Sequence, residues 1–345
     1  MAEVAATPVS TAATTAATTA ATTRRVTPRG VPVSVLYRGQ ADHAFKIIVV
    51  ILSSFIILLA ISMAVVIWVE ARPTFRAFGY LDFLTETTWD PVAAIHGALP
   101  FIFGTLLTSF LALALAVIPA LGVAIFVSEY APTWLSNLIN YTVDLLAAIP
   151  SVVIGLWAVF NFAPFMRDTF YMPIFLWAEE SAPWLAPLLG APSTYNLATA
   201  TIILALMIVP YTVALSRDAI GQVPVEQREA AYALGSTRWE VMRDAVLPYA
   251  RTGVIAGVLL SLARALGETM AVAMLIGNRN RVPFTLFGPA ASMPSLIINE
   301  FREAVEPLHY SSIMAVGFYL FLVTIAINLL ASFIQRKLSI RRGGV

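Results

Sequence analysis

The sequence contains no cysteine and few charged residues. Without cysteine, the chain can form no disulfide, thiolate metal site or cysteine nucleophile. Charged residues make up 12% of the chain, compared with roughly 25% in soluble domains, whereas hydrophobic residues make up 59%. The formal net charge of +1 gives no indication of a nucleic-acid partner. This composition is typical of an integral membrane protein.

Patterns that would mark a catalytic or metal site are also absent from the sequence. It has no G-x-x-x-x-G-K-[ST] stretch, so we expect no loop that holds the phosphates of ATP. The histidines His43, His96 and His309 have no His-x-x-x-His spacing. No Ser-His-Asp pattern or carboxylate pair suggests catalysis. We therefore predict that the chain is not an enzyme and binds no metal or cofactor.

Apolar runs long enough to cross a bilayer recur along the chain. A transmembrane helix needs about 20 predominantly apolar residues. We predict an all-α domain over 46–336, with six transmembrane helices. The expected spans are 47–69, 100–127, 138–163, 197–215, 252–277 and 309–334. The segment 164–196 contains several Pro, Trp and Tyr residues, so we expect a loop that lies partly along the membrane surface.

The two ends of the chain differ in composition from the predicted bundle. Residues 1–45 begin with an Ala/Thr repeat that cannot bury enough surface to offset ordering entropy, so we predict a disordered tail that ends in a basic segment. Residues 337–345 form a basic C-terminus. These ends and the segment 216–251 carry most of the Lys and Arg residues. By the positive-inside rule we place all three on the cytoplasmic side.

The segment between the fourth and fifth spans has a patterned, charged sequence. Pro224 can open a helix because the first turn needs no intrahelical donor, and Gly235 can end one in the left-handed conformation. A second short helix is expected from about Thr237 to Val246, before Pro248 starts the fifth span. Apolar residues within this polar segment favour docking onto another protein. The alternative is a solvated loop that only fixes topology.

Two opposite charges, Arg264 and Glu268, lie within the fifth predicted span, followed by Thr269. A charged side chain at mid-bilayer costs about 2.5 to 3.5 kcal/mol, so it must face a partner, a cavity or a pathway. Four residues apart on a helix, Arg264 and Glu268 can pair and merely fix helix packing. Alternatively, Arg264 leaves Glu268 to bind an anion, because a planar guanidinium suits a phosphate-like oxyanion.

The third predicted span contains two further candidates for a substrate pathway. Asp144 could line the pathway or pair with Arg264, but it lies near the span's end and could equally extend to the interface. Pro150 and Ser151 could break the helix and expose backbone groups to a cavity, as broken helices do in transporters. A kink without function is the alternative for this pair.

One motif in the segment 216–251 resembles the EAA loop of ABC importer membrane subunits. Its matching residues are Glu229, Ala230, Ala231, Gly235, Leu247 and Pro248. Ala245 stands where that family usually has a branched aliphatic residue, which is a small departure from the pattern. The resemblance implies that the short helix with Glu229 inserts into a cleft on a cytoplasmic ATPase subunit and relays its closure.

The runs RALGETMAVAMLIGN (264–278) and LLAAIPSVVIGLW (145–157) resemble PstC-type permeases of the phosphate-specific ABC importer family. The similarity covers about 46–336. It implies a type I permease bundle in a bacterial inner membrane that receives inorganic phosphate from an extracytoplasmic binding protein. The implied partners are a PstA-type permease and a PstB-type ATPase dimer that uses ATP and Mg. The resemblance also implicates Arg264 and Glu268 in phosphate transport.

Other functions remain open from the sequence. Sulfate or molybdate could replace phosphate, because all three are tetrahedral oxyanions that an arginine can bind. A secondary transporter or channel would move substrate without an ATPase. A structural scaffold would keep its complex intact when Arg264 and Glu268 are neutralised, with no effect on flux.

Overall fold

The computed structural model describes residues 33–339, and these are almost entirely helical. The predicted disordered tail lies mostly outside the described residues, and the described backbone is helical from Val33, within the predicted range 1–45. Residues 340–345 of the basic C-terminus also lie outside. The chain divides into two units, one up to Ala60 and one from Ile61.

Helix α1 (Val33–Phe78) contains the first predicted span and runs from the first unit into the second. Its apolar side chains between Phe45 and Val69 are almost all exposed, as expected for a helix that is surrounded by lipid rather than protein. Near its end, Thr74 donates a hydrogen bond to Ser311 at 2.8 Å. Ser311 belongs to α15 (Pro307–Ser339), the last helix of the chain.

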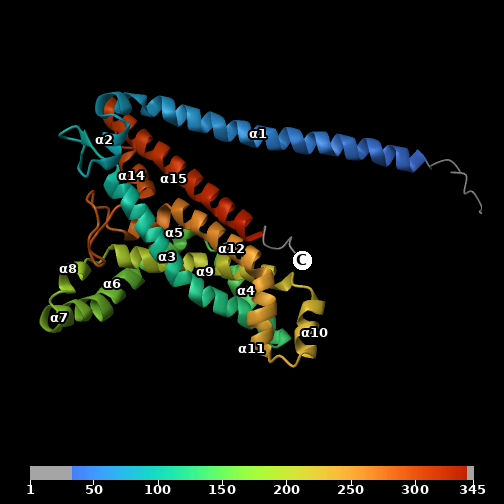
Figure 1. Ribbon diagram of the computed structural model, residues 1–345. Helices are drawn as coiled ribbons and strands as arrows, with labels where there is room; N and C mark the ends of the chain where they lie inside the picture. Colours follow the sequence, from blue (N-terminus) through green and yellow to red (C-terminus); the bar gives the residue numbers. More distant parts are fainter. Residues whose placement is uncertain (1–32, 340–345) are drawn as a thin grey trace, which may run out of the picture. The chain divides into compact units, whose positions relative to one another are not determined.

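The centre of the second unit is α9 (Leu197–Gly221), which packs against α3 (Leu99–Ile125) and α12 (Leu247–Gly267). Small residues on α3, including Ala112, Ala116 and Ala120, are fully buried. Small side chains let membrane helices approach closely. In Figure 1, α8 (Ala186–Leu189) lies at one end of α9, and the turn that carries α10 and α11 lies at the other.

Within the described residues, five helices are long and apolar enough to cross a membrane, and one bent pair makes a sixth candidate. The bent pair is the predicted third span. Its first half, α4 (Thr133–Ala148), meets the helical stretch 151–181 at 90°. Ile149 is extended because a residue before proline disfavours the α conformation, and Pro150 has no N–H to continue the helix.

The predicted loop at 164–196 is helical as far as Ser181, which corrects the sequence-based boundary. The segments are α5 (Ser151–Trp157), η2 (Ala158–Phe162), α6 (Ala163–Met166), η3 (Arg167–Tyr171) and α7 (Met172–Ser181). Pro164 and Pro173 each lie in the first α-helical turn after a π-helical turn. At the end of each π turn the backbone N–H bonds a carbonyl five residues back, as Ala163 N–H bonds Ala158 O, and the helix continues past both prolines.

The segment 216–251 forms one separate short helix rather than two. Helix α10 (Val225–Ala233) follows Pro224 and ends before Gly235, which has a φ of +85°. The second predicted helix, α11 (Arg238–Glu240) and η4 (Val241–Val246), runs into α12 without a break. Pro248 therefore does not start a new helix. The π turn explains this continuity, because the Leu247 N–H bonds Met242 O, five residues back.

The fifth predicted span is two helices. Helix α12 ends at Gly267, and α13 (Met270–Leu275) follows after a break at Glu268 and Thr269. The remaining elements lie in the connections. They are α2 (Tyr80–Thr85), the antiparallel pair β1 (Trp89–Asp90) and β2 (Ile95–His96), η1 (Phe126–Tyr130) and α14 (Met293–Glu300).

Candidate functional site

The two broken spans pack against each other just beyond their breaks. Helix α5 contacts α13, and Gly155 lies at the contact. A Cβ atom at Gly155 would lie 3.2 Å from the Cα of Ala271 and 3.0 Å from the Sδ of Met274. Only a glycine leaves the backbones this close without displacing a neighbour. Segments distant in sequence, each following a helix break, thus meet at one place.

Arg264 lies in the last turn of α12 and stacks on an aromatic ring of α9. Its Cζ is 3.9 Å from the ring centroid of Tyr211, within the range of a cation–π interaction. The Tyr211 hydroxyl donates to the carbonyl of Ala147 at 3.5 Å, near the end of α4. Tyr211 therefore connects Arg264 to the helix that ends at the first break. Arg264 is exposed in the described chain.

Glu268 points to a different place from Arg264. It lines a small pocket together with Thr105 and Thr108 of α3 and Ser292, which precedes α14. Its Oε1 accepts a weak hydrogen bond from the Ala271 N–H at 3.4 Å. The pairing with Arg264 that a continuous helix would allow is not formed, because α12 ends at Gly267 and residue 268 has extended backbone angles.

The other predicted pathway residues surround these breaks without joining one cluster. Thr269 lies within the second break, and its hydroxyl donates to the carbonyl of Gly267 at 3.1 Å. Ser151 is the first residue of α5 and is half-buried. Asp144 is exposed on α4, and no ion pair joins it to Arg264 within the part of the chain that is described.

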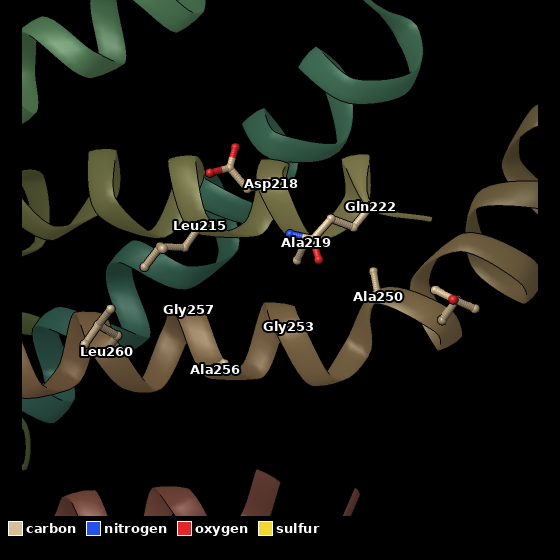
Figure 2. Close-up of a pocket in the computed structure, with 10 residues that line it drawn as sticks. Leu215, Asp218, Ala219, Gln222, Ala250, Gly253, Ala256, Gly257 and Leu260 are labelled. Carbon is tan, nitrogen blue, oxygen red and sulfur yellow. The ribbon is translucent and has the colours of Figure 1, made fainter. Parts of the chain in front are cut away.

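Figure 2 shows a groove between α9 and α12. Gln222 and Ala250, both within the segment 216–251, line it, and so does Leu260, four residues before Arg264 in the sequence. The helices approach closely because α12 has glycines here. A Cβ atom at Gly253 would lie 2.7 Å from the Cβ of Ala219. The groove thus extends from the charged loop towards the arginine.

The EAA-like residues form an exposed surface on α10. Glu229 and Ala230 are exposed, Ala231 is half-buried, and α10 contains no buried residue. The helix ends in a Schellman motif, in which Gly235 N–H bonds Tyr232 O at 2.9 Å and Ser236 N–H bonds Ala231 O at 3.2 Å. Leu247 and Pro248 belong to the continuous helix that begins α12.

Large apolar side chains give this loop the character of a docking surface. Tyr232, Leu234 and Trp239 are exposed, with Leu234 at 88% of its maximal area. They lie among charged residues such as Glu226 and Arg238. Apolar side chains within a charged surface are typical of protein interfaces. The structure places all three on or beside the turn at Gly235.

The sequence did not predict a polar cluster, largely shielded from solvent, that joins the hairpin β1–β2 to α14 and α15. Glu300 accepts hydrogen bonds from Trp89 Nε1 at 2.8 Å and Asn280 Nδ2 at 3.0 Å, and its Oε2 lies 3.0 Å from His309 Nε2. His96 is 1% exposed, and neither ring nitrogen has a hydrogen-bond partner. Burial lowers the pKa of His96, and the neighbouring His309 lowers it further. The only sequence signal was that histidines border apolar runs.

Tyr211 and Arg228 were also missed. Tyr211 was a single aromatic residue next to a proline in an apolar span, which gave no reason to prefer it to other interfacial tyrosines. Arg228 was counted only as a charge for topology, yet its side chain bonds three groups on two other segments. Its partner Glu129 was the one acidic residue of a short connector, which is the signal that could have drawn attention to the pair.

Relatives of this chain carry transport names. The phosphate transport system permease protein PstC of Pasteurella multocida is 40% identical over 311 residues, covering 90% of this chain and 94% of that protein. PstC of Mesorhizobium japonicum is 40% identical over 282 residues, covering 81% and 86%. PstC 2 of Mycobacterium tuberculosis is 36% identical over 309 residues, covering 86% and 93%.

Solved structures support the fold, and a family model identifies the chain. An inward-facing structure of the MetNI methionine ABC transporter superposes with a TM-score of 0.55 at 16% identity, covering 73% of this chain and 99% of that chain. This likeness confirms the predicted helical bundle. The family model of the binding-protein-dependent transport system inner membrane component matches residues 120–342. The chain therefore belongs to the family of inner-membrane components of binding-protein-dependent transport systems.

Proposed function

We propose that this chain is a permease subunit of an ATP-driven importer that moves inorganic phosphate across the cytoplasmic membrane. The observation that carries the proposal is the position of Arg264. It lies beside a helix break, stacked on Tyr211 and without a carboxylate within 4.0 Å among the described residues. Relatives with phosphate transport names support phosphate as the substrate.

The chemistry of Arg264 suits this substrate. A guanidinium presents a planar fork of donors that matches the oxygens of phosphate, and it stays charged at any physiological pH. The ring of Tyr211 holds the guanidinium by one face, which leaves its edges for an anion. Glu268 lies at the adjacent break and lines the small pocket with Thr105, Thr108 and Ser292. Its negative charge would repel phosphate from that pocket and so favour binding at Arg264.

The proposed complex has four kinds of component. A second, PstA-type permease covers the exposed face with Arg264, and an extracytoplasmic binding protein delivers phosphate. A dimer of PstB-type ATPases binds the surface around Tyr232, Leu234 and Trp239 and uses ATP and Mg²⁺. The Lys and Arg distribution supports placing this surface and both termini on the cytoplasmic side.

The transport cycle is alternating access. Closure of the ATPases on ATP moves α10, and the permease pair opens outward to the loaded binding protein. Phosphate then enters the pathway at Arg264. Hydrolysis and reopening of the ATPases return the pair to the inward-open state, and phosphate leaves to the cytoplasm.

The proposal is tested on the complete complex in liposomes, with binding protein outside and ATP inside. We expect Arg264→Gln and Glu268→Gln to abolish phosphate uptake while the subunits still co-purify. Arg167→Gln is the matched control, because Arg167 contributes only a 4.0 Å pair with an exposed Asp168 and one long hydrogen bond. Wild-type uptake rates in both pathway variants would contradict the proposed role of the two residues.

Sulfate and molybdate remain the alternative substrates, and competition distinguishes them. Labelled phosphate uptake is measured with a hundred-fold excess of each unlabelled oxyanion. We expect only phosphate and its close analogue arsenate to compete. Stronger competition by sulfate or molybdate than by phosphate would change the substrate assignment without changing the class of transporter.

A further inference from the structure

The side chain of Arg228 ties α10 to two other segments. Its Nη2 and Nε lie 2.8 and 3.2 Å from Glu129 Oε1, which is in the turn η1 after α3. Its Nη1 donates to the Val223 carbonyl at 2.8 Å, and Nη2 also donates to the Ile220 carbonyl at 3.0 Å. One guanidinium therefore joins α10 to the ends of α3 and α9.

This ion pair is more shielded than the other Arg–carboxylate pairs of the described chain. The side chains of Arg228 and Glu129 are 20% and 17% exposed, whereas those of Arg243 and Asp244 in the same loop are 66% and 62% exposed. Shielded pairs are screened less by salt and lose more when one partner is removed. The Arg228–Glu129 pair is thus the stronger of the two connections.

Few other contacts hold α10 to the body of the protein. The helix has no buried residue, and its half-buried Ala231 packs on the apolar cluster that includes Ile220, Val241 and Met242. That contact connects α10 mainly to η4 and the start of α12. Arg228 supplies a second, directional connection, to α3 and α9.

The two helices that Arg228 reaches are those that carry the candidate pathway. Helix α9 holds Tyr211, which stacks on Arg264. Helix α3 holds Thr105 and Thr108 beside Glu268 and continues into η1 without a break. Helices α3 and α9 therefore connect the contacts of Arg228 to residues on both sides of the pathway.

We propose that Arg228 and Glu129 are positioning residues that transmit the movement of α10 to α3 and α9. The proposal rests on the proposed function, in which an ATPase moves α10. Without the pair, α10 still docks on the ATPase through its exposed surface and Ala231 contact. Its displacement then reaches η4 and α12, and α3 and α9 follow only through their packing on α12, so less phosphate is transported per ATP hydrolysed.

The test compares phosphate transported per ATP hydrolysed in the reconstituted complex. We expect Glu129→Gln and Arg228→Gln each to lower this ratio at least ten-fold, with unchanged co-purification of the ATPase. The double variant is expected to be no worse than the poorer single variant, because both remove the same interaction. Arg228→Lys keeps the charge but not the fork of donors, so its ratio of phosphate transported to ATP hydrolysed should lie between those of Arg228→Gln and the wild type.

The exposed pair in the same loop gives the matched control. Arg243→Gln and Asp244→Asn remove an ion pair of 3.2 Å in the same loop, and we expect wild-type ratios. Unchanged ratios in the Glu129 and Arg228 variants, additive effects in the double variant, or loss of ATPase binding would each overturn the transmission role. If the wild-type complex itself shows no ATP-dependent phosphate uptake, the proposed function fails instead.

Discussion

At the scale of single residues, Arg264 owes its position to Tyr211. A cation–π contact contributes about 0.5 to 2 kcal/mol, so its loss should lower phosphate uptake at limiting phosphate by about 2- to 30-fold. We expect this loss in Tyr211→Leu. Tyr211→Phe keeps the ring and loses only a 3.5 Å hydrogen bond, so it should transport nearly as wild type. Initial rates across a phosphate titration measure both; equal rates in the two variants would show that the ring does not position Arg264.

The contact between α3 and the segment just before α14 depends on one glycine. A Cβ atom at Gly104 would lie against the carbonyl oxygen of Ala291, whereas one at Gly122, on the same helix, would meet nothing within 4 Å. Overpacking of this kind costs about 1 to 3 kcal/mol. We expect Gly104→Ala to lower the melting temperature of the detergent-solubilised protein and Gly122→Ala to leave it unchanged or slightly raised. Similar melting temperatures for the two variants would contradict this packing.

At the scale of elements, the positions of the membrane helices were predicted well from the sequence. Their breaks and continuations were predicted less well. Apolar length located the runs that form α3, α9 and α15, because lipid requires about 20 apolar residues in a row. Breaks and continuations depend on contacts distant in sequence. The sequence predicted that Glu268 lies in the middle of a continuous helix, yet α12 ends before it and α13 packs on α5. The π turn before Pro248 likewise has no sequence signal that we could recognise.

The sequence predicted the residue types of the candidate site, but not the side chains that they contact. Arg264 and Glu268 were found because charge within a membrane span is costly. The sequence left open whether the two residues pair, and their separation follows from the helix end at Gly267. Tyr211 and Arg228 act through contacts with other helices, so only the structure could assign them.

The turn at Gly235 ends α10 and shapes the docking surface. Its φ of +85° is open to glycine but not to proline, whose ring fixes φ near −65°. Gly235→Pro also removes the N–H that bonds Tyr232 O. We expect this variant to lose ATPase co-purification or to hydrolyse ATP without transport. Gly221→Ala is the control, because its added Cβ meets nothing within 4 Å; ATPase activity that stays linked to transport in Gly235→Pro would count against the docking role.

The buried His96 makes the hairpin β1–β2 sensitive to acid. Its pKa is lowered by burial and by His309, while Glu300, Glu306 and Asp90 oppose this shift. The unfolded chain then binds a proton more readily than the folded chain. Stability is therefore full above the ordinary histidine pKa of about 6.5 and falls as the pH decreases below it.

His96→Phe tests this pH dependence. Phenylalanine has no proton to bind and fits a site beside the rings of Trp89 and Phe78. We expect the melting temperature of the wild-type protein to fall more steeply than that of the variant between pH 7 and pH 5. Parallel pH profiles would mean that His96 is not the group responsible.

At the scale of the whole molecule, the exposure of Arg264 indicates that the chain does not form its pathway alone. A charge facing lipid at mid-bilayer costs about 2.5 to 3.5 kcal/mol, so a second membrane subunit is expected to cover this face. The groove between α9 and α12 is lined by Gln222 and Ala250, near the loop that we assign to the ATPase, and by Leu260, four residues before Arg264 in the sequence (Figure 2). We therefore expect partner subunits to cover both the exposed face with Arg264 and the surface that we assign to the ATPase.

The most direct test of this account is phosphate uptake into liposomes that contain either this chain alone or the complex recovered by a tagged pull-down from mild detergent. We expect the pull-down to recover a second permease and an ATPase. We expect the complex to take up phosphate only with ATP inside and binding protein outside, and the lone chain to take up none. Phosphate uptake by the lone chain without ATP would contradict the account and identify a secondary transporter instead.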